Sequence, residues 1–254
     1  MYEIQTYLGA DGLMHCTVCK EPVEAFYPKG SLLEMRKHHR QCACERKAYA
    51  EEAQYYKEKE HRELIARNKK ICFEEKEMEG FTFQNVERDS GVIRIAEEYV
   101  TNWQKMKQNH MGYLFWGPVG TGKSYLAACI ANALLEKEVT VKMTNFNTIL
   151  NDLFAAEDKT EYIRLLNGYE LLIIDDLGVE RSSEYALENI FGVIDWRYRS
   201  GKPLIITTNL PLAQLKQETK IEKKRIYDRI LERCIPVKID GVSRREAMAN
   251  DDMQ

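Results

Sequence analysis

The sequence predicts an α/β fold in which a parallel sheet is flanked by helices around a phosphate-binding loop. Three observations predict it. From about residue 81 onward, aliphatic strand-like runs alternate with amphipathic helical stretches. Residues 45–79 contain no Gly or Pro and are dense in Glu, Lys and Arg, and residues 1–44 hold four of the seven cysteines. We therefore expect a cysteine-rich module at 1–44, a charged helical linker at 45–80 and a nucleotide-binding domain at 81–254.

Two close cysteine pairs organise the first segment. Cys16 and Cys19 have two residues between them, Cys42 and Cys44 have one, and residues 20–41 separate the pairs. Four thiolates on such loops suit tetrahedral Zn²⁺ at ~2.3 Å. Because so short a segment buries little apolar surface, a metal would supply much of its folding free energy.

The second cysteine pair has only one intervening residue, so other interpretations of the cluster stay open. A histidine could replace one cysteine, an iron–sulfur cluster could replace zinc, or the four could be unrelated reduced thiols. The candidate histidines are His15, His38 and His39. The other three cysteines, Cys72, Cys129 and Cys234, are expected to be buried or half-buried and without a metal. Neighbouring Arg36–Arg40 forms a basic cluster that is either a contact surface or merely solvated.

The charged segment predicts one long, mostly solvated helix. Glu58 with Arg62, and Glu63 with Arg67, form favourable pairs four residues apart. We expect Gly80 to end this helix.

Residues 117–124 read Gly-Pro-Val-Gly-Thr-Gly-Lys-Ser, a complete phosphate-binding loop. The apolar run Tyr113–Trp116 precedes it as a buried strand, and the helix-forming stretch Lys123–Lys137 follows. Glycines let backbone N–H groups approach a polyphosphate, and the helix N-terminus adds partial positive charge. The residues predicted to contact the nucleotide are Gly117, Pro118, Val119, Gly120, Thr121, Gly122, Lys123, Ser124 and Tyr125. We expect Lys123 to reach the β- and γ-phosphates and Ser124 to ligate Mg²⁺.

A second strand at Val139–Thr144 and helices near 148–155 and 159–167 lead to the buried strand Leu171–Asp176. Its two carboxylates lie at the end of the strand, where open α/β sheets place their ligands. Asp175 is suited to hold Mg²⁺, and Asp176 to activate the attacking water.

Two more segments complete the predicted nucleotide site. Strand 203–208 ends at Asn209, whose amide is placed to bond the water or the γ-phosphate. The predicted helix Ile221–Arg233 presents Arg225 and Arg229 on one face, from which an arginine could reach a neighbouring subunit's γ-phosphate.

Together these motifs resemble the AAA+ ATPases, and more closely the bacterial and phage replicative-helicase loaders of the DnaC/DnaI type with their IstB-type transposition relatives. The matching stretches lie in family order: the phosphate loop, Leu-Ile-Ile-Asp-Asp-Leu-Gly, Asp195-Trp196-Arg197-Tyr198, the strand ending in Thr-Thr-Asn, Tyr227-Asp228-Arg229-Ile230 and Gly241-Val242-Ser243-Arg244-Arg245. They span roughly residues 110–245. The Asp175-Asp176 pair also follows the loaders, since most AAA+ members have Asp-Glu.

This resemblance implies an ATPase, working with ATP and Mg²⁺, that assembles through its AAA+ domain. It implies that the N-terminal region binds a replicative DNA helicase, which the ATPase then loads onto single-stranded DNA. It also implies that Arg229 is the arginine finger and Arg245 the second sensor, with Arg225 and Arg244 as near alternatives.

DNA binding has weaker support from the residues themselves. In loaders, the helices between the second strand and the Asp-Asp strand are thought to touch DNA, and here that stretch is only lightly basic. Its cations are Lys142, Lys159 and Arg164, set against Asp152, Glu157, Asp158 and Glu161. The aromatic residues Phe146, Phe154 and Tyr162 are suited either to stacking on bases or to the core.

The composition of the chain limits the classes of protein to which it can belong. A net charge of −3 and a pI near 6.1 exclude a globally basic protein. No apolar run approaches the ~18–20 residues that span a bilayer, and Met1–Ala10 does not resemble a secretory signal, so we expect a cytoplasmic protein without membrane contact. The alternatives are an IstB-like transposition helper, a small-molecule kinase and a zinc-dependent binding protein with a degenerate ATPase. No lid-like segment supports the kinase, and the complete motifs disfavour the degenerate ATPase.

Overall fold

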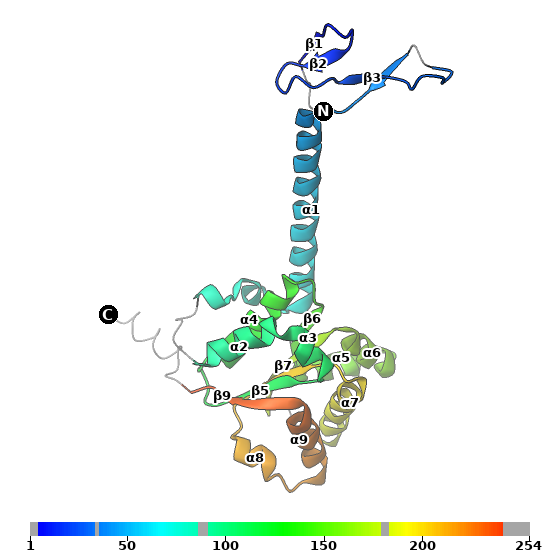
Figure 1. The fold of residues 1–254 in the computed structure, drawn as a ribbon. Helices are drawn as coiled ribbons and strands as arrows, with labels where there is room; N and C mark the ends of the chain where they lie inside the picture. The colour runs from blue at the N-terminus through cyan, green and yellow to red at the C-terminus, as the bar shows by residue number, and fades with distance from the viewer. Residues whose placement is uncertain (1–4, 34–35, 86–90, 179–182, 241–254) are drawn as a thin grey trace. The chain divides into compact units, whose positions relative to one another are not determined.

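The computed structural model describes residues 5–33, 36–85, 91–178 and 183–240 (Figure 1). The chain divides into two compact units, Met1–Leu64 and Ile65–Gln254. The predicted three-part division at 44 and 80 stays a prediction.

The first unit contains two small hairpins. Strands β1 (Thr6–Leu8) and β2 (Met14–Cys16) pair antiparallel, as do β3 (Glu24–Phe26) and β4 (Lys37–His39). The buried core of this module consists of Cys16, Val23 and Cys42. Because so little apolar area is buried, the hairpins depend on something else for stability.

Helix α1 spans Ala43–Cys72, and its buried residues are Ile65 and Cys72. It is the predicted charged helix, but the expected end at Gly80 is wrong. The helix ends eight residues earlier, and a 3₁₀-helix, η1 (Lys76–Gly80), follows. The reason is tertiary, because Phe73 is 5 % exposed and enters the core of the second unit as the chain leaves α1.

The second unit is built on a five-stranded parallel sheet, which confirms the predicted fold class. Its strands are β5 (Gly112–Trp116), β6 (Val141–Asn145), β7 (Leu171–Leu177), β8 (Leu204–Thr208) and β9 (Cys234–Lys238), in the spatial order β6-β7-β8-β5-β9. Every pair is parallel, so all carboxyl ends meet at one edge. The edge strand β9 was not predicted, since Cys-Ile-Pro-Val-Lys contains a proline and lacks a continuous aliphatic run.

Helices cover both faces of this sheet (Figure 1). They are α2 (Gly91–Thr101), α3 (Trp103–Gln108), α4 (Lys123–Leu135), α5 (Phe146–Ala155), α6 (Lys159–Gly168), α7 (Glu184–Ser200), α8 (Leu212–Lys216) and α9 (Ile221–Arg233), with a further 3₁₀ turn, η2, at Phe83–Asn85. Alternate residues of β7 belong to two separate hydrophobic cores, and each core contains different helices. Leu171 and Ile173 pack with α2, α3 and α4, whereas Leu172 and Ile174 pack with α5, α6, α7 and α9. A strand buried on both faces explains the unbroken aliphatic run in the sequence.

Candidate nucleotide site and cysteine cluster

The phosphate loop connects β5 to α4 at the carboxyl edge of the sheet. Gly117 admits no side chain, because a Cβ there would lie 2.2 Å from the Ile239 carbonyl oxygen. Gly122, at φ 91°, is in the left-handed region and is the residue from which α4 begins. Helix α4, thirteen residues long, therefore presents the N–H groups of its first turn at the loop, without a side-chain cap from Gly122.

Lys123 folds back over this loop. Its ammonium donates hydrogen bonds to the carbonyls of Gly117 (3.1 Å) and Pro118 (2.6 Å), and the residue is 5 % exposed. Burial lowers the pKa of Lys123, while the charges of Asp176 and Asp175 act in the opposite direction. A buried ammonium that donates to two backbone carbonyls suits an anionic ligand, because phosphate oxygens would provide the opposite charge.

The two carboxylates lie on a β-bulge. Ile174 pairs with Ile206 and Leu177 with Thr208, so Asp175 and Asp176 together oppose the single residue Thr207. At the bulge, Asp176 adopts φ 55° and is exposed, whereas Asp175 is partly buried. In a regular strand, consecutive side chains point to opposite faces of the sheet. The bulge interrupts this alternation at Asp175 and Asp176, which differ in burial.

Thr207 connects both acidic residues. Its buried hydroxyl donates to Asp175 Oδ1 and accepts a hydrogen bond from the Asp176 N–H at 2.9 Å. Burial raises the pKa of Asp175, and hydrogen bonds from Thr207 and from the Ser124 hydroxyl lower it. Sequence reasoning missed Thr207, whose only signal was a hydroxyl near the tip of a buried strand.

Ser124 and Asp175 are the residues predicted to share Mg²⁺, and they lie near enough for the Ser124 hydroxyl to lower the pKa of Asp175. A hydroxyl and a carboxylate are oxygen ligands of the kind that Mg²⁺ prefers. The donor set and its position beside Lys123 therefore fit a magnesium–nucleotide complex.

The remaining loop and strand-tip residues have distinct surroundings. Val119 is exposed, and the Thr121 hydroxyl donates to the Pro118 carbonyl at 3.0 Å. Tyr125 stacks on Phe81 with ring centroids 4.4 Å apart. Asn209 directly follows β8, one residue beyond the strand tip.

The predicted finger arginines stand on α9, which packs against α7. Arg229 donates through Nε and Nη2 to Asp195 Oδ1, each at 2.7 Å, while Arg199 contacts the second oxygen of that carboxylate at 2.8 Å. Arg225 is exposed and its guanidinium lies over the Phe191 ring at 4.3 Å. Within one subunit, neither arginine is brought to the phosphate loop. The predicted sensors Arg244 and Arg245 lie outside the described residues.

The four clustered cysteines converge in the first unit. The Sγ atoms of Cys16, Cys19, Cys42 and Cys44 all lie within 4.8 Å of one another, and all seven cysteines of the chain are free thiols. Tetrahedral zinc with ~2.3 Å bonds requires sulfur atoms about 3.8 Å apart. The N–H of Glu21 lowers the pKa of Cys19 to about 6, whereas burial raises the pKa values of Cys42 and Cys44. The donor set therefore fits zinc.

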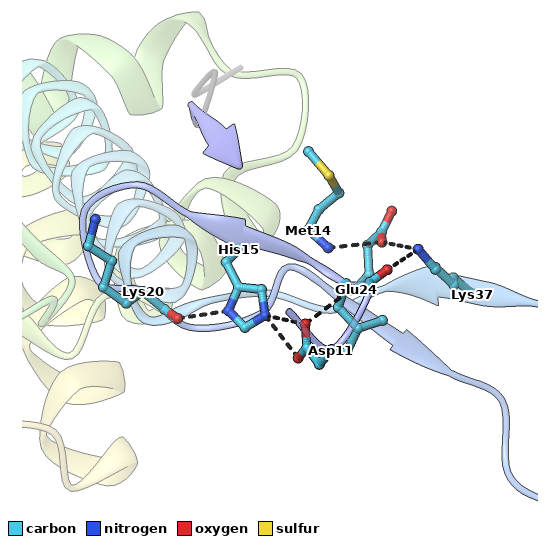
Figure 2. Close-up of polar contacts among 8 residues, drawn as sticks. Asp11, Met14, His15, Lys20, Glu24 and Lys37 are labelled. Atoms are coloured by element: carbon cyan, nitrogen blue, oxygen red, sulfur yellow. Dashed lines mark hydrogen bonds and ion pairs between the residues drawn. The ribbon is translucent and has the colours of Figure 1, made fainter. Parts of the chain in front are cut away.

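The histidine alternatives have other partners. His15 bonds the Lys20 carbonyl through Nδ1 (2.9 Å) and both Asp11 oxygens through Nε2 (3.0 Å), as Figure 2 shows. His38 bonds a backbone carbonyl through Nδ1, and His39 lies 3.3 Å from Glu45. Among the described residues, the metal-compatible group thus contains cysteines alone.

The candidate DNA-contacting residues differ in their burial and in the contacts that their side chains make. Phe146 is 2 % exposed and belongs to the core, whereas Phe154 is 81 % exposed. Tyr162 donates its hydroxyl to Asp152 at 2.8 Å, and Arg164 pairs with Glu161 at 2.5 Å. Lys142 and Lys159 contact the Ile71 carbonyl and the Tyr185 ring, respectively. Phe154 is therefore the aromatic residue of this set most available for stacking.

The chain is similar in sequence to known proteins. The sequence profile of the family described as IstB-like ATP binding protein matches residues 48–251. The chain is 24% identical over 192 residues to the replicative helicase loader DnaI of Bacillus subtilis (strain 168), covering 69% of this chain and 62% of that protein. It is 29% identical over 149 residues to the replicative helicase loader DnaC of Escherichia coli (strain K12), covering 57% and 58%. The chain thus spans about three fifths of the length of these relatives.

Among solved structures, the crystal structure of DnaI is similar at a TM-score of 0.60 and 25% identity, covering 70% of this chain and all of that one. The sheet and phosphate loop are thus the AAA+ core that the sequence predicts. No helix among the described residues is long and apolar enough to cross a membrane.

Proposed function

The chain belongs to the family of IstB-like ATP binding proteins, and on this premise we propose that it is an ATPase that loads a replicative DNA helicase onto single-stranded DNA. One observation carries the ATPase half of the proposal. Lys123, Ser124 and Asp175 converge at the carboxyl edge of the sheet although the last two are 51 positions apart in sequence.

The proposed binding roles follow from position. The N–H groups of residues 117–124 receive the polyphosphate, and Lys123 exchanges its carbonyl partners for the β- and γ-phosphates. Ser124 and Asp175 would hold Mg²⁺, which would neutralise phosphate charge in the transition state. Thr207 keeps the Asp175 carboxylate oriented toward the metal.

Hydrolysis requires a positioned water and a stabilised transition state. Asp176, exposed at the bulge, accepts the proton of the attacking water, and the Asn209 amide orients that water. Arg229 is proposed to act on the nucleotide of a neighbouring subunit, with Arg225 as the alternative, and Arg245 on that of its own subunit. Self-association would then complete each site, which makes turnover depend on assembly.

The N-terminal region is proposed to bind the helicase. The supporting features are the four-thiol cluster, proposed to hold zinc, and exposed apolar residues of the same module, including Leu8, Val18 and Leu32. Contact with single-stranded DNA is assigned to α5 and α6, where Phe154 is exposed.

The deciding experiment is a pull-down with the purified replicative helicase of the same host, with ATP and with ADP, followed by a helicase-loading assay on single-stranded DNA. The proposal expects complex formation, loss of that complex when residues 1–44 are deleted, and loading that stops in Lys123→Ala. Absence of any complex in either nucleotide state would refute the helicase assignment and leave the ATPase assignment standing.

The match to the IstB-like profile favours a second candidate, an ATPase that directs a transposase to DNA. The same pull-down with a transposase, and an ATP-dependent strand-transfer assay, separate the two functions. A helicase loader stimulates neither transposase binding nor strand transfer.

A further inference from the structure

The carboxyl end of α1 is fastened to the edge of the sheet by one acidic residue. Glu74, two residues beyond the helix, accepts hydrogen bonds from the hydroxyls of Thr144 (2.7 Å) and Thr148 (2.9 Å). Thr144 lies near the end of β6 and is 5 % exposed, and Thr148 is in the first turn of α5. A single carboxylate therefore spans the junction between a strand and the helix that follows it.

Neighbouring contacts hold the same end of α1. Lys142 on β6 donates to the Ile71 carbonyl at 3.1 Å, and Lys69 pairs with Glu136 at 2.9 Å. Cys72 and Phe73 are 0 % and 5 % exposed within the core that includes α4. Residues 69–74 are thus attached to β6 and to α4, the helix that carries the phosphate loop.

This attachment lies beside the proposed metal ligand. Asn145, the residue after Thr144, is the register partner of Asp175. Glu74 and Asp175 both line a cleft of about 40 Å³, which has room for no more than a few waters. Its lining residues are Glu74, Glu75, Met78, Met143, Thr144, Asn145 and Asp175.

We propose that Glu74 is a positioning residue that couples the end of α1 to the metal-holding carboxylate of Asp175. The inference rests on the proposed function, in which Ser124 and Asp175 hold a magnesium nucleotide. Asp175, when it holds the metal, would restrain its ladder partner Asn145 and the adjacent Thr144, and would thereby tighten the attachment of residues 69–74. Because coupling is reciprocal, the attachment strengthens magnesium-nucleotide binding by the same factor.

The test measures hydrogen–deuterium exchange of residues 69–74 with and without Mg²⁺–ADP, together with nucleotide affinity over a magnesium titration. In the wild type, nucleotide slows exchange of these amides. In Glu74→Ala, nucleotide still binds, the slowing disappears, and magnesium-nucleotide affinity falls by about 2- to 30-fold, the range expected for residues along a coupling path.

Three further variants isolate the carboxylate. Glu75→Ala removes a charge from the same cleft and is expected to behave as the wild type. Thr144→Val, which deletes one partner hydroxyl, reproduces the Glu74→Ala defect, and the double variant loses little more than either single one. Glu74→Gln keeps one acceptor oxygen and offers its NH2 group as a donor to the other hydroxyl, which can also accept, so it restores most of the protection.

The outcomes separate this inference from the proposed function. Absence of nucleotide binding in the wild type defeats both. Normal binding without slowed exchange at residues 69–74, or equal defects in Glu74→Ala and Glu75→Ala, overturns the coupling alone. If Glu74→Ala does not fold, Thr144→Val and Glu74→Gln decide by the same measurements.

Discussion

Replacing Thr207 by valine removes one hydroxyl from a fully buried position between the two acidic residues of β7. Valine keeps nearly the same volume and branching, so packing in the strand should not change. Two hydrogen bonds disappear: the one donated to Asp175 and the one accepted from the Asp176 N–H.

The magnitude follows from the type of each bond. A hydrogen bond to a charged carboxylate contributes about 1.5–3 kcal/mol and a neutral one about 0.5–1.5 kcal/mol. The free energy of unfolding should therefore fall by about 2–4.5 kcal/mol. Because residues that orient a metal ligand typically affect metal affinity or activity by about 10- to 100-fold, we expect turnover to fall in that range.

Thr208→Val provides the matched control. Thr208 is equally buried, donates to the Leu177 carbonyl at 2.7 Å and accepts from the Leu210 N–H at 3.1 Å, but has no acidic partner. Its loss should cost about 1–3 kcal/mol and leave the magnesium dependence of ATP hydrolysis unchanged. Urea denaturation measures stability, and steady-state hydrolysis over a magnesium titration measures the site.

Equal magnesium dependence in Thr207→Val and Thr208→Val would refute the reasoning. So would an undiminished turnover in Thr207→Val at saturating magnesium, because Asp175 would then need no second group to orient it.

Three further predictions concern the other proposed groups. Lys123→Ala should abolish nucleotide binding or hydrolysis, and wild-type ATP affinity and turnover in that variant would contradict the loop assignment. Arg229→Ala should preserve ATP binding and remove the hydrolysis that self-association stimulates; full stimulated turnover would exclude Arg229 as the finger. Metal analysis should find one zinc per chain, and chelation of that zinc should release the four clustered thiols of Cys16, Cys19, Cys42 and Cys44. Cys72 and Cys234 should stay protonated at pH 8, because burial raises the pKa values of both thiols. Near-zero zinc in protein with a folded N-terminus would end the zinc assignment.

Local chemistry explains which features could be predicted from the sequence. The phosphate loop could be located because its backbone requires glycine where a side chain would collide, as at Gly117. The central strands could be located because burial on both faces demands continuous aliphatic residues, as in Leu171–Ile174. The cysteine pairs could be grouped because a metal needs donors on short loops.

Other features had no local signal. The charged helix was predicted to continue to Gly80, but burial of Phe73 and the bonds of Glu74 turn the chain directly after Cys72. Arg197, noted in the sequence only as part of a motif, is 1 % exposed. It donates to the carbonyls of Tyr169, Glu170 and Pro203 at distances from 2.6 to 3.1 Å.

The sequence by itself determined the chemistry that consecutive residues can carry: a loop for phosphates, a strand ending in two carboxylates, and two pairs of thiols. Tertiary structure decided which distant groups serve that chemistry. Thr207 reaches Asp175 across 32 positions of sequence and Glu74 reaches Thr144 across 70. Helical and strand periodicities relate only neighbours along the chain, so contacts of this kind arise only when the sheet brings its carboxyl ends together.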